Sequence, residues 1–311
     1  ITGKNIKAFF SFDSTSQKEI FIQVAISPVS VEGAKRNLQS EAMGLHFDQV
    51  KAAAETKWNA ELSKIDVKDN DIKKMRIFYT ALYHTAIVPN INMDVDGSYR
   101  GMDDKIHKAD GYTYYSVFSL WDTYRATHPL YAIIDRQRTL DYIKTFLTHF
   151  QQGGRLPVWE LASNETDCMI GYHSVPVITD AYVKGINEFD TLLALKAMVK
   201  SAEWDHYGLP AYRLKGVINT EDEHESVSKT LEYAYDDYCI ALFAKAMGDI
   251  ALFNKFIARS QQYRNVLDVQ TGCMRPRKNG GWWNPFDPKE VNNHFTEANS
   301  WQYSFYVPQD V

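Results

Sequence analysis

The stretch Gly185-Ile186-Asn187-Glu188-Phe189-Asp190 decides the fold. It forms a very short link between two helical segments and carries the two signals that such a link needs. Glycine adopts the left-handed conformation that ends many helices, and aspartate caps the first turn of the helix that follows. We therefore predict two antiparallel helices joined at 185–190.

The same arrangement recurs along the chain. Gly248-Asp249 repeats both signals, and Ile134-Asp135 makes a similar break without glycine. Long loops rich in glycine, asparagine, aspartate and aromatic residues alternate with these links, at roughly 89–118, 151–170, 205–225 and 270–295. Helix pairs with short links on one side and long loops on the other indicate a mainly α fold, a toroid of helical hairpins (an α/α barrel). An α-solenoid scaffold is the alternative, but solenoid repeats keep a near-constant length and these units do not.

The N-terminal part has a different pattern. Residues 1–30 alternate between apolar and polar positions, which predicts two β-strands joined by a turn at Asp13-Ser14-Thr15-Ser16. From Phe47 to Ile65 the apolar residues fall at steps of three and four, which predicts an amphipathic helix, and a second helix is expected at about 71–88, before Pro89. We expect the first helix to link two domains.

Composition narrows the function classes. The chain has 311 residues, a formal net charge of −5, seven Trp and nineteen Tyr. There is no stripe of lysine and arginine of the kind that nucleic acid requires, and no apolar run approaches the roughly 20 residues of a membrane span. The three cysteines have neither CxxC spacing nor an even count, so they predict no disulfide framework and no zinc site.

Two long loops end in dense groups of functional side chains. The first gives Ser119-Leu120-Trp121-Asp122-Thr123-Tyr124-Arg125, an indole face with two charged groups nearby. Sugars bind in this way, because their C–H faces stack on rings and their hydroxyls need donors and acceptors. The alternative is an ion pair between Asp122 and Arg125 on an exposed helix, with Trp121 in the core. The second loop gives Leu156-Pro157-Val158-Trp159-Glu160-Leu161 and then Asn164-Glu165-Thr166-Asp167-Cys168-Met169-Ile170-Gly171-Tyr172-His173.

Two further stretches are open to more than one interpretation. The acidic run 221–225 is interpreted as a solvated face or as first-turn acids of the next helix. On that helix the adjacent Asp236 and Asp237 point about 100° apart, so we do not expect them to act as a catalytic pair. The paired Trp282 and Trp283 lie on a glycine-rich loop and could either wall a sugar subsite or pin the loop to the domain.

The last stretch is Asn292-Asn293-His294-Phe295-Thr296-Glu297-Ala298-Asn299-Ser300-Trp301-Gln302-Tyr303. We expect Thr296 to cap a helix, with Glu297 in its first turn beside aromatic rings. A carboxyl group in such surroundings is poorly solvated, which favours a general acid near neutral pH. The alternative is a first-turn acid that only favours the helix dipole.

Taken together, these motifs resemble glycoside hydrolase family 92, the calcium-dependent exo-α-mannosidases. The resemblance rests on 119–125, 156–161, 164–173 and 296–303, in this order at loop-to-helix junctions. It implies the end of a β-sandwich domain at 1–40, a helical linker at 41–68 and the first part of an (α/α)₆ barrel at 69–311. It also implies that Glu297 is the general acid and that the sugar pocket is lined by residues of the other motifs, namely Trp121, Asp122, Arg125, Glu160, Glu165 and His173.

The resemblance further implies inverting hydrolysis of terminal α-mannosides, often α-1,2 linked in N-glycans, assisted by Ca²⁺. The family's general base and most of its calcium ligands are expected beyond Val311, so residues 1–311 alone are expected to be inactive. A periplasmic, surface-anchored or secreted location is implied as well. Three alternatives stay open: a non-catalytic carbohydrate-binding protein on the same scaffold, an α-solenoid scaffold that binds proteins, and another α/α-barrel glycosidase of the glucoamylase-like kind.

Overall fold

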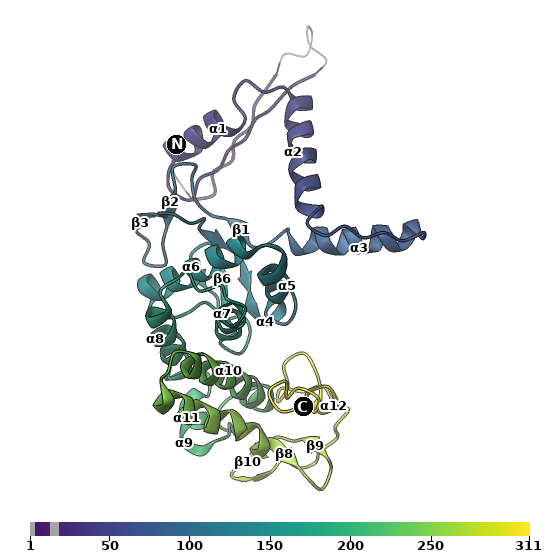
Figure 1. Ribbon diagram of the computed structural model, residues 1–311, viewed down its shortest axis with the longest axis vertical. Helices are drawn as coiled ribbons and strands as arrows, with labels where there is room; N and C mark the ends of the chain where they lie inside the picture. Colours follow the sequence, from purple (N-terminus) through teal and green to yellow (C-terminus); the bar gives the residue numbers. More distant parts are fainter. Residues whose placement is uncertain (1–3, 13–18) are drawn as a thin grey trace.

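The structure is a computed structural model that describes residues 4–12 and 19–311, and helices dominate it (Figure 1). The helices are α1 (Val31–Glu41), α2 (Phe47–Leu62), α3 (Ile72–Thr85), α4 (Leu120–Thr123), α5 (Thr127–Ile134), α6 (Arg136–Gly153), α7 (Ser174–Val183), α8 (Thr191–Ala202), α9 (Leu209–Lys215), α10 (Ser226–Ala246), α11 (Ile250–Arg259) and α12 (Ser300–Tyr303), with a 3₁₀ helix η1 at Ser260–Val266. No helix in the described ranges combines the length and apolar character needed to cross a membrane.

The strands are short and lie in the long loops. They are β1 (Asn90–Ile91), β2 (Ser98–Arg100), β3 (Ile106–Lys108), β4 (Tyr115–Ser116), β5 (Phe118–Ser119), β6 (Trp159–Leu161), β7 (Asn164–Glu165), β8 (Leu267–Asp268), β9 (Cys273–Met274), β10 (Arg277–Lys278) and β11 (Gly281–Trp282). Each pair is antiparallel, and the order β5-β6-β7 forms the one sheet of three strands among the described residues. This sheet joins two loops that are 40 residues apart in sequence, and both carry predicted site residues.

The three short links between helices are confirmed. Gly185 and Gly248 have φ angles of 77° and 82°, in the left-handed region that glycine adopts without a steric penalty. Asp190 and Asp249 each accept a hydrogen bond from the backbone N–H three residues further on, as N-caps do, and Asp135 caps α6 in the same way. The helical hairpins α5–α6, α7–α8 and α10–α11 follow from these local signals.

Helix α10 is the centre of the core. It packs against α7, α8 and α11, while α5 packs against α6 and α7 (Figure 1). Side chains with no exposed surface fill the space between these helices, among them Phe146, Ile178, Ile240, Phe243 and Phe256. Burying a large apolar side chain of this kind stabilises the fold by about 1.5–3 kcal/mol.

The strands predicted near the N-terminus are not present in the described residues. Residues 4–12 and 19–30 form no strand, and the predicted turn at Asp13-Ser14-Thr15-Ser16 lies outside the described residues. Phe9, Phe10 and Val24 are 90%, 82% and 80% exposed. An isolated hairpin is marginal in water unless a third strand or a helix covers its apolar face, and no described segment covers this one.

Helix α1 was not predicted, and its anchor explains why. Its first turn is capped by Ser30, but its packing depends on contacts distant in sequence. The buried Asn37 donates to Asp94 Oδ1 (2.9 Å), and Ser27 donates to Asp94 Oδ2 (2.8 Å). Because α1 is anchored by polar side chains, its sequence lacks the apolar periodicity from which a helix is predicted.

The two predicted helices after it are confirmed, as α2 and α3. Helix α3 ends at Thr85, three residues before the predicted end. No residue of α2 is buried; its apolar stripe is covered only in part, where Trp58 contacts the ring of Tyr83 with centroids 4.5 Å apart. Helices α2 and α3 therefore extend away from the helical hairpins (Figure 1).

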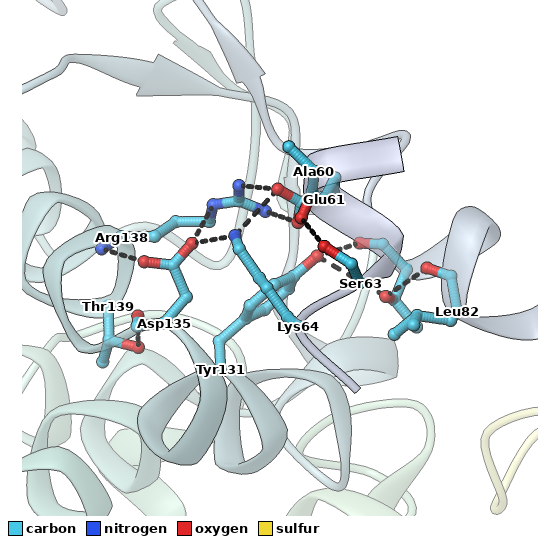
Figure 2. A network of polar contacts seen from close by, with 10 residues as sticks. Ala60, Glu61, Ser63, Lys64, Leu82, Tyr131, Asp135, Arg138 and Thr139 are labelled. Atoms are coloured by element: carbon cyan, nitrogen blue, oxygen red, sulfur yellow. Dashed lines mark hydrogen bonds and ion pairs between the residues drawn. The ribbon is translucent and has the colours of Figure 1, made fainter. Parts of the chain in front are cut away.

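A four-residue charge network attaches the end of α2 to the α5–α6 turn (Figure 2). Arg138 binds both carboxylate oxygens of Glu61, at 2.8 and 2.7 Å. Lys64 bridges Glu61 (2.8 Å) and Asp135 (2.5 Å), and Arg138 also lies 3.1 Å from Asp135. All four side chains are 17–26% exposed, so solvent screens these charges less than those of exposed ion pairs. Burial alone would raise the pKa of Glu61, but hydrogen bonds from Arg138 and Lys64 hold it below its usual value.

We predict that Glu61→Gln lowers the free energy of unfolding by about 1–2 kcal/mol at pH 7. Because the pKa of Glu61 is lowered in the folded state, this contribution is present above pH 4.5 and is lost as the pH falls below that value. Urea unfolding of the wild type and the variant between pH 7 and pH 3 should show the difference shrinking in acid. Asp66→Asn is the matched control, since Asp66 is 74% exposed and lies 3.9 Å from its Lys68 partner. Equal losses in both variants would contradict the assigned role of the network.

Candidate functional site

The first predicted motif begins in the three-stranded sheet. In its register Phe118 lies opposite Glu160 and Ser119 opposite Trp159, and β5 continues directly into α4. Leu120 is buried, so the neighbouring Trp121 is directed away from the core and is half-buried. The alternative with Trp121 in the core is therefore wrong.

The ion pair between Asp122 and Arg125 is also not formed. Asp122 is exposed and accepts a hydrogen bond from Ser119 Oγ. The guanidinium of Arg125 instead lies over three aromatic rings, with its carbon 5.2 Å from the centroid of Trp121, 4.8 Å from Tyr124 and 5.1 Å from Tyr306. Such cation–π contacts hold Arg125 in place and leave part of its surface open to solvent.

One buried carboxylate connects these groups. Glu232, on α10, has no exposed surface. Its Oε1 accepts from Trp121 Nε1 (3.0 Å) and Tyr303 Oη (2.9 Å) and lies 3.5 Å from Arg125 Nη2. Its Oε2 lies 2.5 Å from His173 Nε2. A buried carboxylate is costly unless it is paired and hydrogen-bonded, and here four groups from three separate parts of the chain surround it.

His173 is held between two carboxylates. Its Nδ1 lies 2.8 Å from Asp236 Oδ1, opposite the contact with Glu232, and its ring stacks on Tyr124 with centroids 4.1 Å apart. Burial by itself lowers the pKa of His173, but Asp236 and Glu232 outweigh it and raise this pKa to about 9. His173 is therefore an imidazolium at neutral pH, and it is buried rather than lining an open pocket.

Asp236 and Asp237 both accept hydrogen bonds from Tyr172, from its backbone N–H and its hydroxyl respectively, but their charged partners differ. Asp236 accepts from His173 and from the backbone N–H of Tyr172 (2.8 Å). Asp237 pairs with Arg259 Nε (2.8 Å). Burial raises the pKa of Asp237 to about 6, against the opposing effect of Arg259.

Glu160 lies inside the three-stranded sheet and is fully buried. Its carboxylate accepts from Ser116 Oγ (3.0 Å), Val117 N (3.1 Å) and Ser163 N (2.5 Å). Burial raises its pKa to about 7, against the effect of these hydrogen bonds. Val117 and Ser163 have positive φ angles, which are unfavourable for residues with a Cβ atom, so Glu160 stabilises a strained backbone.

Glu165 has a similar local role. It accepts from the backbone N–H groups of Val158 (2.8 Å), Trp159 (2.8 Å) and Asp167 (2.9 Å). Three such bonds close the loop between β6 and α7 around one carboxylate. Glu160 and Glu165 thus shape the loops, and in this structure neither lines the hollow described below.

The segment before α12 differs from the prediction. The N-cap is Asn299, which accepts from Gln302 N (3.1 Å) while the Gln302 side chain accepts from Asn299 N (3.0 Å), a capping box. Thr296 is not a cap, and Glu297 is not in a first helical turn: it precedes the helix, has a φ of 50° and is exposed. The sequence signal that identifies the cap is the glutamine three residues after Asn299.

Glu297 nevertheless lies in one hollow with Trp121 and Arg125. This hollow has a volume of about 220 Å³ and is lined by Trp121, Arg125, Thr296, Glu297, Ala298, Gln302, Tyr303 and Tyr306. Asp122, Glu160, Glu165 and His173 are not among its lining residues. Glu297 is the single carboxylate that lines it within the described part of the chain. Trp301 is directed elsewhere, 51% exposed with Lys289 over its ring.

Sequence reasoning did not identify Glu232, although a signal was present. Glu232 and Asp236 are four residues apart and so share one face of α10, where they bind the two ring nitrogens of His173. Tyr303 and Tyr306 were also missed, because their roles depend on how α12 packs against α10. Residues 4–12 and 19–311 contain no group of three or more His, Cys, Asp or Glu side chains placed to hold one metal ion.

We predict that His173 makes folding stability depend on pH in the alkaline range. Its folded pKa of about 9 exceeds the ordinary value of 6.5, so its contribution is fully present below pH 6.5 and is lost as the pH rises through 9. The loss should amount to about 3 kcal/mol, measured by urea unfolding between pH 6 and pH 10. In His173→Gln this alkaline decline should disappear, whereas His206→Gln, at an exposed histidine, should retain it. A wild-type stability that does not change over this range would contradict the prediction.

Comparisons with known proteins agree with these observations. The sequence model described as the glycosyl hydrolase family 92 catalytic domain matches residues 33–311. The structure is similar to that of the family GH92 α-mannosidase BT3965 from Bacteroides thetaiotaomicron, at 42% identity and a TM-score of 0.86, over 91% of this chain and 39% of that chain. The same protein has been solved in complex with mannoimidazole.

Two further relatives give the same result. The GH92 inverting mannosidase BT2199 from Bacteroides thetaiotaomicron is 29% identical, with a TM-score of 0.85, over 90% of this chain and 40% of that chain. A protein of Arthroderma benhamiae named an uncharacterized secreted glycosidase is 24% identical over 97% of this chain and 40% of its own length. The chain spans about 40% of the length of these relatives. Because the family match covers most of the chain, the protein belongs to glycosyl hydrolase family 92.

Proposed function

We propose that the complete protein is an exo-acting α-mannosidase that releases terminal mannose, with α-1,2-linked N-glycan mannosides as the expected substrates. The observation that carries the proposal is the hollow in which Glu297 lies with the indole of Trp121 and the guanidinium of Arg125. An indole face, a fixed cation and a carboxyl group are the side chains that one terminal sugar needs for stacking, hydroxyl recognition and protonation. Family membership and the mannosidase names of the relatives support the same substrate class.

In the proposed reaction Glu297 protonates the glycosidic oxygen as the bond to the leaving sugar breaks. The sugar itself would exclude water from the exposed Glu297 carboxyl when it fills the hollow. Trp121 would contact the apolar face of the ring, and Arg125 would donate hydrogen bonds to hydroxyls. Glu232 does not take part in proton transfer in this scheme, because four neighbouring groups already occupy its carboxylate. It holds Trp121, Arg125 and Tyr303 in position.

An inverting mechanism is part of the proposal. It needs a second carboxylate about 6.5–9.5 Å from the acid to activate water on the opposite face of the sugar. Glu297 is the single carboxylate lining the hollow within the described residues, so we propose that another part of the complete protein supplies the base. Residues 1–311 alone should then release no mannose. The helix pairs of 69–311 would form part of an (α/α)₆ barrel, preceded by a linker at 41–68 and the end of a β-sandwich at 1–40.

Calcium also belongs to the proposal. Ca²⁺ takes six to eight oxygen ligands, and the described residues bring together no carboxylate cluster that fits this need. We therefore assign no step to the ion and no ligand in this chain. A periplasmic, surface-anchored or secreted location is proposed for the complete protein, in line with the secreted glycosidase among its relatives.

We predict that Glu297→Gln in the complete protein lowers kcat by about 10²–10⁴-fold for a mannobiose substrate, the range typical of a lost general acid. An aryl α-mannoside with an activated leaving group should lose much less, because its leaving group needs little protonation. Steady-state kinetics on both substrates tests this, with Glu290→Gln as an exposed carboxyl control outside the hollow. Equal losses on both substrates would remove Glu297 from the acid role.

We also predict that a chelator abolishes mannose release by the complete protein and that added Ca²⁺ restores it. Because the proposed dependence on the ion does not involve the leaving group, the activity on the mannobiose and on the aryl mannoside should fall together. Mannose release that persists after exhaustive chelation would remove calcium from the mechanism. A protein that binds mannosides but releases none, with or without Ca²⁺, would favour the carbohydrate-binding alternative.

A further inference from the structure

We propose that a second hollow, which we name the Trp283 hollow, binds sugar residues of the leaving part of the glycan, beyond the bond that is cut. It has a volume of about 420 Å³, and its lining includes Glu221, His224, Lys278, Trp283, Asn293 and His294. The inference rests on the proposed function, since it extends the substrate away from Glu297. It answers the question left open by the sequence, whether the paired tryptophans form a subsite or only hold the loop.

The position of this hollow is fixed relative to Glu297 by the backbone. The segment 293–297 lines both hollows, with Asn293 and His294 in one and Thr296 and Glu297 in the other. The Cα atoms of His294 and Glu297 are three residues apart and so at most about 11 Å from each other. This is within the reach of an oligosaccharide whose terminal residue occupies the first hollow.

The segment that joins the hollows is held rigidly. Its carbonyl groups at Asn293 and His294 accept from Glu225 N (2.6 Å) and Val227 N (3.1 Å) at the start of α10, and Thr296 N donates to a side chain of the same helix turn. Such bonds satisfy N–H groups that a helix terminus leaves free. A ligand that spans both hollows would therefore bind to a surface that is already formed, which limits the entropy lost on binding.

The chemistry of the Trp283 hollow suits a neutral sugar. Each of the two neighbouring tryptophans has a cation over its ring, Lys278 over Trp283 (4.8 Å) and Arg277 over Trp282 (4.1 Å). They differ in that Trp283 lines the hollow, beside the ring of His294 (centroids 4.7 Å), and Trp282 does not. Within the described residues, the side chains of Asn293 and His294 form no hydrogen bond with the protein, so their polar groups can bind hydroxyls. Lys278 and Glu221 provide one charge of each sign, which does not favour an ionic ligand.

The test compares Trp283→Ala with Trp282→Ala in the complete protein, using an α-mannotetraose and an aryl α-mannoside that fills only the first hollow. The quantity compared is kcat/KM for the tetraose divided by kcat/KM for the aryl mannoside. We expect Trp283→Ala to lower this ratio about tenfold, mainly by raising KM for the tetraose. Trp282→Ala should leave this ratio within about twofold of the wild-type value, because the ring that it removes from the same loop does not line the hollow. An unchanged ratio in Trp283→Ala, or an equal drop in both variants, would overturn the proposal.

A second variant and a binding measurement separate loss of the sugar site from a folding defect. If Trp283→Ala does not fold, Asn293→Ala replaces it, since that side chain has no hydrogen bond to the described protein, and its ratio must fall for the proposal to stand. Calorimetric binding of mannotetraose to Glu297→Gln, with and without Trp283→Ala, tests the hollow without turnover. If the wild-type protein releases no mannose but Trp283→Ala still weakens the binding of mannotetraose, the proposed function is refuted and the binding site stands. If the wild-type protein releases mannose but Trp283→Ala does not weaken the binding of mannotetraose, only the binding site is refuted.

Discussion

The Glu232 carboxylate sits on the central helix of the core and has no contact with solvent. A buried charge of this kind is stable only when enough donors surround it, and its donors come from α4, from α12 and from the residue that precedes α7. The arrangement of the hollow therefore depends on one electrostatic requirement. Trp121 and Tyr303 line the hollow with their polar ends bound to Glu232, and Arg125 lies between aromatic rings within reach of the same carboxylate.

Carboxylates hold the surrounding loops in the same manner. Glu160 and Glu165 bind backbone N–H groups of loops that contain residues with positive φ angles, and Glu61 attaches α2 to the α5–α6 hairpin through Arg138. Burial works against the ionised form at Glu160 and raises its pKa to about 7, so this loop is stabilised at some electrostatic cost. Irregular backbone in these loops is thus maintained by side-chain acceptors, because the strands β4 to β7 have only two or three residues each.

The sequence predicted the parts of the fold that depend on local signals. The links at Gly185, Asp190, Gly248 and Asp249 were predicted correctly, because a left-handed glycine and a capping aspartate act within one turn. The N-terminal strands were wrong for the described residues, since a strand needs a partner that alternation alone does not reveal. The cap predicted before α12 was also wrong, because Asn299 and Thr296 are both common cap residues and the glutamine three positions after Asn299 completes the capping box.

The candidate site was predictable in its composition and less so in its geometry. The motifs led to Trp121, Arg125 and Glu297, which do line one hollow. They also led to His173 and Glu160, which are buried and do not line it. A dense run of polar residues looks the same in sequence whether its side chains bind a ligand or hold a loop in place. Glu232 was missed since its partners lie 59 to 111 residues away along the chain.

The shared carboxylate also limits how this pocket can be redesigned. Replacing any one of the donors to Glu232 leaves part of a buried charge uncompensated, which lowers stability and disturbs the positions of the remaining donors. Residues 121, 125, 173, 232 and 303 should therefore behave as a single unit in laboratory evolution, where exchanges one at a time are rejected and altered sugar selectivity arises at wall positions outside the unit, such as Ala298 and Gln302.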